Sequence, residues 1–349
     1  MPGPTPVSEP LHTPASDIAI IGVGHRLPTI TEDNDELCKN LDVTPEWIIE
    51  KTGIQRRYIA GPDDTASQYS IDAAQKALLV AGIPAQEIDL VIACTFSSDY
   101  LFPPLSAKVH KDLGLKGGQI FDLQANCAGF VSGLTVAADR MKSDASIRNA
   151  LVIGVEFNSR IIDRSDVNSA IYHSDGAGAA ILGRRPGTGI IASSFYTDSS
   201  NYESVRLRGG GSSFPLKGRD FDASIDTMEL NGIATWKQAI THLPTVIRSA
   251  FAKAGYAPEE ADFLIFHQAN LRLIEYLMRK MKFDFAKTYM NVQDIGNTGA
   301  ASVAIALSQA YERGLLKKDS LLTLAAVGAG FNFGASVWRW AIDTPRETA

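Results

Sequence analysis

The chain has 349 residues, of which 45% are hydrophobic and 21% charged, and its net charge at pH 7 is -6. No apolar run reaches the roughly 18 residues of a membrane span, and the acidic balance with no basic run argues against nucleic-acid binding, so we expect neither kind of partner. The three cysteines are widely spaced and odd in number, which predicts a cytoplasmic protein with no disulfide and no zinc site.

Residues 1–16 are rich in proline and lack the basic and apolar stretches of a signal peptide, so we expect a disordered lead-in. Beyond it, residues 77–92 and 250–265 match without a gap at a constant offset of 173 (250 − 77). Each copy predicts a helix ending at Ala-Gly, an acidic turn and a buried strand. The chain is therefore predicted to divide into two similar halves, residues 17–185 and 186–349.

A second pair of segments supports the duplication. Residues 123–130 and 292–299 are each predicted to end a strand and to open an alanine-rich helix, over 131–141 and 300–313 respectively. The strands 150–154 and 321–325 follow these helices. A repeat of half the chain length, with strands and helices in alternation, favours two α/β halves packed against each other over a solenoid.

Three polar residues fall at corresponding places in this duplication. Cys127 lies at a predicted helix start, where unpaired N–H groups stabilise a thiolate. Asn297 holds the matching position in the second half, and His267 follows the repeated strand there. Since sites in α/β sheets form beyond the carboxyl ends of strands, we expect the three to converge. In the alternative interpretation, Cys127 is a core residue and His267 a satisfied polar group.

Other candidate motifs are weaker. Residues 20–28 resemble a dinucleotide fingerprint, but Leu27 stands where the third glycine is needed, so a strand and turn are predicted. The glycine-rich segment 174–181 is predicted to be a tight turn into a buried strand. His25, His110 and His173 have no partners at metal-ligand spacing and are predicted to be structural or exposed.

The motifs at residues 126–130 (Asn-Cys-Ala-Gly-Phe), 267–272 (His-Gln-Ala-Asn-Leu-Arg) and 296–302 (Gly-Asn-Thr-Gly-Ala-Ala-Ser) resemble the three active-site motifs of β-ketoacyl-ACP synthase III enzymes. Residues 46–54 and 175–179 are also similar, and the resemblance covers residues 17–342. It implies an α/β thiolase fold with duplicated halves in five αβαβα layers, usually as a homodimer. No cofactor or metal is implied, because the substrates are thioesters of acyl carrier protein or CoA.

The resemblance also implies a mechanism. Cys127 would attack an acyl thioester, and the backbone N–H groups of Cys127 and Ala329 would form the oxyanion hole. His267 and Asn297 would then stabilise the enolate of the second substrate. Phe102 would reach across the dimer to close the partner's acyl pocket.

The resemblance further implies binding residues. Arg272, Arg279 and Lys280 would dock the acidic acyl carrier protein. Trp47 would stack on the adenine of CoA, but Val167 stands at the position of the usual second partner, an arginine, so loading from carrier protein is expected to exceed loading from CoA.

Val327 and Phe331, at the two ends of the glycine-rich loop 328–331, would contact substrate. Two further departures from the family pattern occur. Val327 replaces a phenylalanine that favours loss of CO2, and Gly299, in the 296–302 motif, replaces a serine. These changes indicate a specialised member, in polyketide-type biosynthesis.

Three functions remain open on these residues. In the first, a ketosynthase condenses the acyl chain with a malonyl-type or a β-ketoacyl thioester. In the second, an acyltransferase moves the chain to a hydroxyl or amine and needs mainly His267, as a base. In the third, the chain is a silent partner of a heterodimer. Retention of Asn297 favours condensation.

Overall fold

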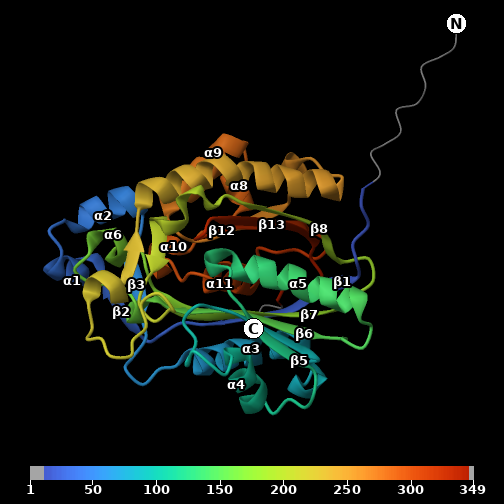
Figure 1. Ribbon diagram of the computed structural model, residues 1–349. Helices are drawn as coiled ribbons and strands as arrows, with labels where there is room; N and C mark the ends of the chain where they lie inside the picture. The colour runs from blue at the N-terminus through green and yellow to red at the C-terminus, as the bar shows by residue number, and fades with distance from the viewer. Residues whose placement is uncertain (1–11, 346–349) are drawn as a thin grey trace, which may run out of the picture.

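The computed structural model describes residues 12–345. Two sheets lie one above the other, with a pair of helices between them and further helices on the two outer faces (Figure 1). This is the five-layered αβαβα arrangement of the thiolase fold, as predicted. Every strand of the lower sheet falls within residues 18–184 and every strand of the upper sheet within residues 189–339.

The lower sheet belongs to the first half of the chain and has the strand order β1-β7-β6-β4-β5. Strand β4 is parallel to both of its neighbours, β5 and β6, whereas β7 is antiparallel to the central strand β6 and to β1. The elements are β1 (Ile18–Arg26), β4 (Leu90–Cys94), β5 (Gln119–Leu123), β6 (Ala150–Phe157) and β7 (Asp175–Arg184), with α3 (Ala66–Ala81) and α4 (Leu105–Asp112) on the outer face.

The upper sheet has the order β11-β12-β13-β8, in which only β11 and β12 are parallel. Its elements are β8 (Gly189–Thr197), β11 (Phe263–Phe266), β12 (Leu321–Gly328) and β13 (Asn332–Arg339), with α8 (Gly232–Ala254) and α9 (Leu271–Met281) outside. The smaller elements are β2 (Ile30–Asp33), α1 (Asn34–Leu37), α2 (Pro45–Thr52), β3 (Arg56–Ile59), α6 (Val167–Ala170), β9 (Val205–Leu207), α7 (Ala223–Asp226), β10 (Met228–Leu230) and α10 (Val292–Ile295).

The central layer consists of α5 (Gly129–Ser143) and α11 (Ala301–Glu312), whose apolar residues pack against both sheets. Small residues allow the close approach. A Cβ added at Gly133 would lie 2.5 Å from Cys94 Sγ, and one added at Gly154 would lie 2.4 Å from the carbonyl oxygen of Ala300. Because these segments are rich in alanine and glycine, the helices of the middle layer pack close to the two sheets. The site is built at this layer.

The repeat predicted from the sequence is confirmed. Helices α3 and α8 end at Gly82 and Gly255, with φ of 67° and 76°, and each is followed by a short acidic turn and a parallel strand, β4 or β11. Left-handed backbone at a helix end favours glycine, which explains why this residue recurs.

One predicted strand is wrong. Residues 292–295 form the short helix α10, in which the two buried residues Val292 and Ile295 are three positions apart, as on one turn of helix. Asn297 follows it in an isolated bridge to His173.

Part of the predicted lead-in is ordered. Residues 12–16 are held against the end of α8 and the start of β8, since Thr13 N–H donates to Ala254 O (3.1 Å) and Ser16 N–H to Ile190 O (3.0 Å). Residues 1–11 lie outside the described residues. Within residues 12–345, no helix combines the length and the apolar character needed to cross a membrane.

Candidate active site

Cys127 follows β5 in a single 3-10 turn, Asn126–Ala128, that leads directly into α5. Burial, followed by the charge of Glu156, raises the pKa of the Cys127 thiol to about 12, although its own backbone N–H favours the thiolate. The sequence predicted a helix start that stabilises a thiolate. The helix start is present, but burial outweighs it in this structure, so Cys127 rests as a thiol.

The glycine-rich loop between β12 and β13 lies against the Cys127 turn. Asn126 Nδ2 donates to Ala329 O at 2.9 Å. A Cβ added at Gly328 would lie 2.4 Å from Ala125 O and 3.0 Å from Ala128 N, so only glycine fits there. These contacts bring the backbone of Ala329 beside that of Cys127, which is the arrangement that two oxyanion-hole donors require.

His267 comes directly after β11, where its backbone N–H donates to Ala325 O at 2.8 Å. The ring is buried, and Nδ1 lies 2.6 Å from the hydroxyl oxygen of Ser302 on the first turn of α11. Burial, with a smaller contribution from His173, lowers the pKa of His267 to about 3. The imidazole is therefore neutral at neutral pH, with a proton on one nitrogen only.

Ser302 decides which nitrogen carries that proton. Its oxygen accepts from the Gln268 N–H at 3.3 Å, and the residue is 1% exposed. The only acceptor within reach of its own proton, among residues 12–345, is His267 Nδ1. Since a buried hydroxyl donor without a partner costs free energy, Ser302 donates to Nδ1. His267 then carries its proton on Nε2, which becomes a hydrogen-bond donor.

The side chain of Asn297, like that of His267, is held so that it can donate a hydrogen bond. Its side-chain oxygen Oδ1 accepts from the Gly299 N–H at 2.9 Å, which assigns Nδ2 as the hydrogen-bond donor of the side chain. Its backbone is fixed on both sides, because its N–H donates to Tyr172 O (2.8 Å) and its carbonyl accepts from Ser174 N–H (2.9 Å).

Glu156 packs against the Asn297 loop. A Cβ added at Gly299 would lie 2.6 Å from Glu156 Cγ, and Gly299 has a φ of +55°. The carboxyl accepts from Ser97 Oγ at 2.6 Å, and burial raises its pKa well above the ordinary range. The Gly299 position, where the resemblance led us to expect serine, is therefore occupied by the Glu156 side chain.

The helix starts of the two halves also meet here. A Cβ added at Gly129, two residues after Cys127, would lie 3.6 Å from Ala300 Cβ, three residues after Asn297. Together with the Ser302 contact to His267, this packing gathers the three predicted residues around the amino ends of α5 and α11.

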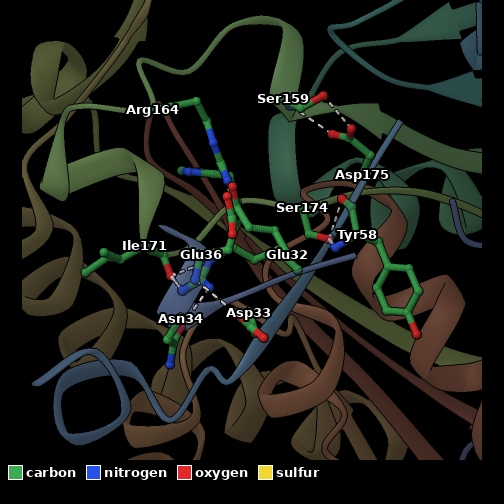
Figure 2. A network of polar contacts seen from close by, with 12 residues as sticks. Glu32, Asp33, Asn34, Glu36, Tyr58, Ser159, Arg164, Ile171, Ser174 and Asp175 are labelled. Atoms are coloured by element: carbon green, nitrogen blue, oxygen red, sulfur yellow. Dashed lines mark hydrogen bonds and ion pairs between the residues drawn. The ribbon is translucent and has the colours of Figure 1, made fainter. Parts of the chain in front are cut away.

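A polar network clamps the segment 171–175 (Figure 2), in which His173 forms the backbone bridge to Asn297. Arg57 donates to Ile171 O through Nε (3.2 Å) and Nη2 (2.6 Å). The Ser174 hydroxyl accepts from Tyr58 N–H (2.7 Å) and donates to Tyr58 O (3.0 Å). Asp175 accepts from the N–H (2.8 Å) and hydroxyl (2.5 Å) of Ser159. The backbone beside the site is therefore held rigidly.

The remaining predicted substrate residues are spread around this centre. Trp47 lies on α2 and is 37% exposed, and Val167 is half-buried on α6. Phe102 is 84% exposed in the loop before α4. Val327 and Phe331 are buried in the upper-half core.

The three predicted docking cations lie on or beside α9, and two of them have intramolecular roles. Arg272 donates to the carbonyls of Ile49 (3.0 Å) and Glu50 (3.1 Å) at the end of α2, and Lys280 donates to Ile240 O (2.7 Å). Arg279 is 67% exposed, and its only ion pair among the described residues, to Glu275, is 3.7 Å long. Arg279 is therefore the most available of the three.

Sequence reasoning missed three residues of this site: Ser302, Glu156 and His173. Ser302 ends the 296–302 motif, so its place in that motif was the available signal. His173 was set aside because it lacked metal-ligand spacing. Within residues 12–345 no cluster of three metal-ligating side chains occurs. The backbone of His173 instead pairs with that of Asn297, which places His173 beside the site.

Comparison with known proteins gives consistent matches. The family model for 3-oxoacyl-[acyl-carrier-protein] synthase III matches residues 121–199, and the model for its C-terminal part matches residues 251–340. The chain is 36% identical over 323 residues to β-ketoacyl-[acyl-carrier-protein] synthase III of Caldanaerobacter subterraneus subsp. tengcongensis, covering 92% of this chain and 97% of the relative.

Two crystal structures are also similar. The 3-oxoacyl-[acyl-carrier-protein] synthase III of Aquifex aeolicus VF5 has a TM-score of 0.86 and 33% identity, covering 93% of this chain and 100% of its own. The priming β-ketosynthase of the R1128 polyketide pathway has a TM-score of 0.87 and 30% identity, covering 96% and 99%.

Proposed function

This chain belongs to the β-ketoacyl-ACP synthase III family, and on that premise we propose that it is a ketosynthase of fatty-acid or polyketide-type biosynthesis. It takes an acyl chain onto Cys127 and joins that chain to a second, carrier-protein-bound thioester by a new carbon–carbon bond. No metal or redox cofactor is needed, because both substrates arrive as activated thioesters.

The first half-reaction is a transthioesterification at Cys127. The sulfur attacks the thioester carbonyl, the bond to the donor thiol breaks, and the cysteine proton leaves with that thiol. The N–H groups of Cys127 and Ala329 hold the oxyanion as it forms. The start of α5 acts on the thiolate as charge develops, although the resting group is a thiol.

The second half-reaction requires an enolate, and one observation supports it above all others. Ser302 sets the proton of His267 on Nε2, and the Gly299 N–H fixes the Asn297 amide with Oδ1 as acceptor and Nδ2 as donor. We infer that these two neutral donors act on the same substrate oxygen. Such a pair stabilises the oxygen of a thioester enolate, whose carbon then attacks the acyl-Cys127 carbonyl and releases the thiolate.

The acyltransferase alternative demands the opposite state of His267. A base for a hydroxyl or amine acceptor must present a lone pair on Nε2, and it gains little from Asn297. The hydrogen bonds of Ser302 favour a proton on Nε2 instead. Condensation is accordingly the function that this geometry supports better.

Substrate and partner assignments follow from exposed residues. Acyl carrier protein would dock through Arg279, with Arg272 and Lys280 beside it on α9. Phe102 is placed on the surface, where a second copy of the chain could cover it and so close the acyl pocket of a homodimer. A cytoplasmic location agrees with the three free cysteines.

The proposed function is tested by mass spectrometry of the intact protein after incubation with panels of acyl-CoA and acyl carrier protein, followed by peptide mapping. An added acyl mass on Cys127 and a condensed product on addition of a second thioester are expected. Acylation on Cys38 or Cys94, or esters and amides as the only products, would overturn the assignment.

A further inference from the structure

His173 is buried directly opposite Asn297. The Asn297 N–H donates to Tyr172 O, and its carbonyl accepts from Ser174 N–H, so the two segments form one parallel bridge in which His173 and Asn297 are paired. Residues paired in this way project their side chains to the same side of the bridge. The imidazole of His173 and the amide of Asn297 are therefore neighbours, and both are more than nine-tenths buried, at 5% and 8% exposed.

The hydrogen bonds of His173 fix the roles of its two nitrogens. Nδ1 lies 2.8 Å from Ser169 O, and since a carbonyl oxygen can only accept, Nδ1 carries the ring proton. Burial lowers the pKa of His173, so at neutral pH the ring is neutral and Nε2 keeps its lone pair. Nε2 has no hydrogen-bond partner in the described part of the chain.

The site thus combines one acceptor with two donors. His267 Nε2–H and Asn297 Nδ2–H suit the oxygen of an enolate, whereas His173 Nε2 suits a proton that must be removed. His173 is also close enough to His267 to lower its pKa. The bonds of Ile171 and Ser174 to β3 hold the backbone on both sides of His173, so the ring is positioned before substrate arrives (Figure 2).

We propose that His173 is a further catalytic residue, the general base that takes the α-proton of a 3-oxoacyl thioester as the second substrate, an inference that rests on the ketosynthase function proposed above. The α C–H bond breaks, its proton moves to His173 Nε2, and the electron pair forms the enolate held by His267 and Asn297. The enolate carbon attacks the acyl-Cys127 carbonyl. The C–S bond then breaks, and the Cys127 thiolate takes the proton back from His173.

The substrate class follows from the strength of this base. A malonyl-type thioester forms its enolate by losing CO2 and needs no base. A neutral imidazole is too weak to deprotonate a simple acyl thioester, but a CH2 between two carbonyl groups is far more acidic and matches it. A 3-oxoacyl thioester is therefore the class of second substrate whose α-proton His173 can remove.

The test separates the two half-reactions. Cys127 is acylated in wild type, His173→Gln and His173→Phe, the donor is removed, and the acyl-enzyme is chased with a 3-oxoacyl or a malonyl thioester on carrier protein. Glutamine retains polarity without a basic nitrogen, and phenylalanine retains the ring. His242→Gln, which changes a histidine paired with Asp198 outside the site, is the matched control.

We expect unchanged acylation in all variants, and consumption by the 3-oxoacyl thioester about 100-fold slower or more in both His173 variants, the effect of losing a general base. Wild-type rates in either acylated variant, or a wild-type acyl-enzyme consumed by the malonyl thioester alone, would overturn the role of His173 while leaving the ketosynthase function intact. A wild-type Cys127 that accepts no acyl group, or an acyl-enzyme that neither thioester consumes, would instead overturn the proposed function itself.

Discussion

The Nδ1 atom of His267 and the hydroxyl oxygen of Ser302 lie 2.6 Å apart, in a place where neither is open to solvent. This contact turns a histidine that could act as a base into a donor, because the serine hydroxyl has no other acceptor among residues 12–345. In the proposed mechanism, the donor role of His267 therefore depends on the buried Ser302.

Replacing Ser302 by alanine should remove the hydrogen bond that holds the proton of His267 on Nε2. Condensation is expected to slow about 2- to 13-fold, which corresponds to the 0.5–1.5 kcal/mol of a typical hydrogen bond, while acylation of Cys127 is unaffected. Single-turnover kinetics of each half-reaction measure the two effects. Ser308→Ala, which removes a buried hydroxyl from the same helix but contacts His25, should leave both rates unchanged. Equal effects of the two substitutions would contradict the role given to Ser302.

Serine at position 299 should destabilise the fold. The φ of +55° costs an L-residue about 1–2 kcal/mol, and the clash with Glu156 adds an overpacking cost of about 1–3 kcal/mol. Urea denaturation measures the sum. Gly82→Ser has a similar φ of +67° but open space around its Cβ, so it should show the backbone cost alone. If both variants lose the same stability, Glu156 does not fill this space as described.

The buried His267 should make the fold sensitive to acid. Its folded pKa of about 3 lies below the value near 6.5 of the unfolded chain, so unfolding takes up a proton between these limits. The stability it contributes is complete above pH 6.5 and is lost as pH falls toward 3. Between pH 7 and 5 the wild type should lose about 2 kcal/mol more unfolding free energy than His267→Gln. Parallel losses measured in urea at the two pH values would disprove this.

Val167 should limit the use of CoA. It is half-buried on α6, shares an apolar cluster with α2, the helix that carries Trp47, and offers no cation or planar group for an adenine to stack on. With one acyl group, loading of Cys127 from carrier protein is therefore expected to exceed loading from CoA, and Val167→Arg should raise only the latter. The readout is the rate of acyl-enzyme formation. Comparable wild-type loading from the two donors would refute it.

Much of this site could be predicted from the sequence, for a physical reason. The repeat placed Cys127 and Asn297 at matching helix starts and His267 after a strand, and glycine, alanine and apolar periodicity mark such positions locally. Burial is a property of the whole fold, however, so the raised pKa of Cys127 could not be read from its place at a helix start. The same holds for His173, whose pairing with Asn297 joins residues far apart in the chain.

In the proposed mechanism, Asn297 serves enolate formation and not acylation. Asn297→Ala should acylate Cys127 at nearly the wild-type rate, because that step uses the separate oxyanion hole of Cys127 and Ala329. Consumption of the acyl-enzyme should fall about 100- to 1,000-fold, the cost of one lost donor to a developing oxyanion. Time-resolved mass spectrometry of the intact protein follows both steps in one experiment. An Asn297→Ala enzyme that consumes its acyl group at the wild-type rate, with an alcohol or amine acceptor and no new carbon–carbon bond, would contradict the account.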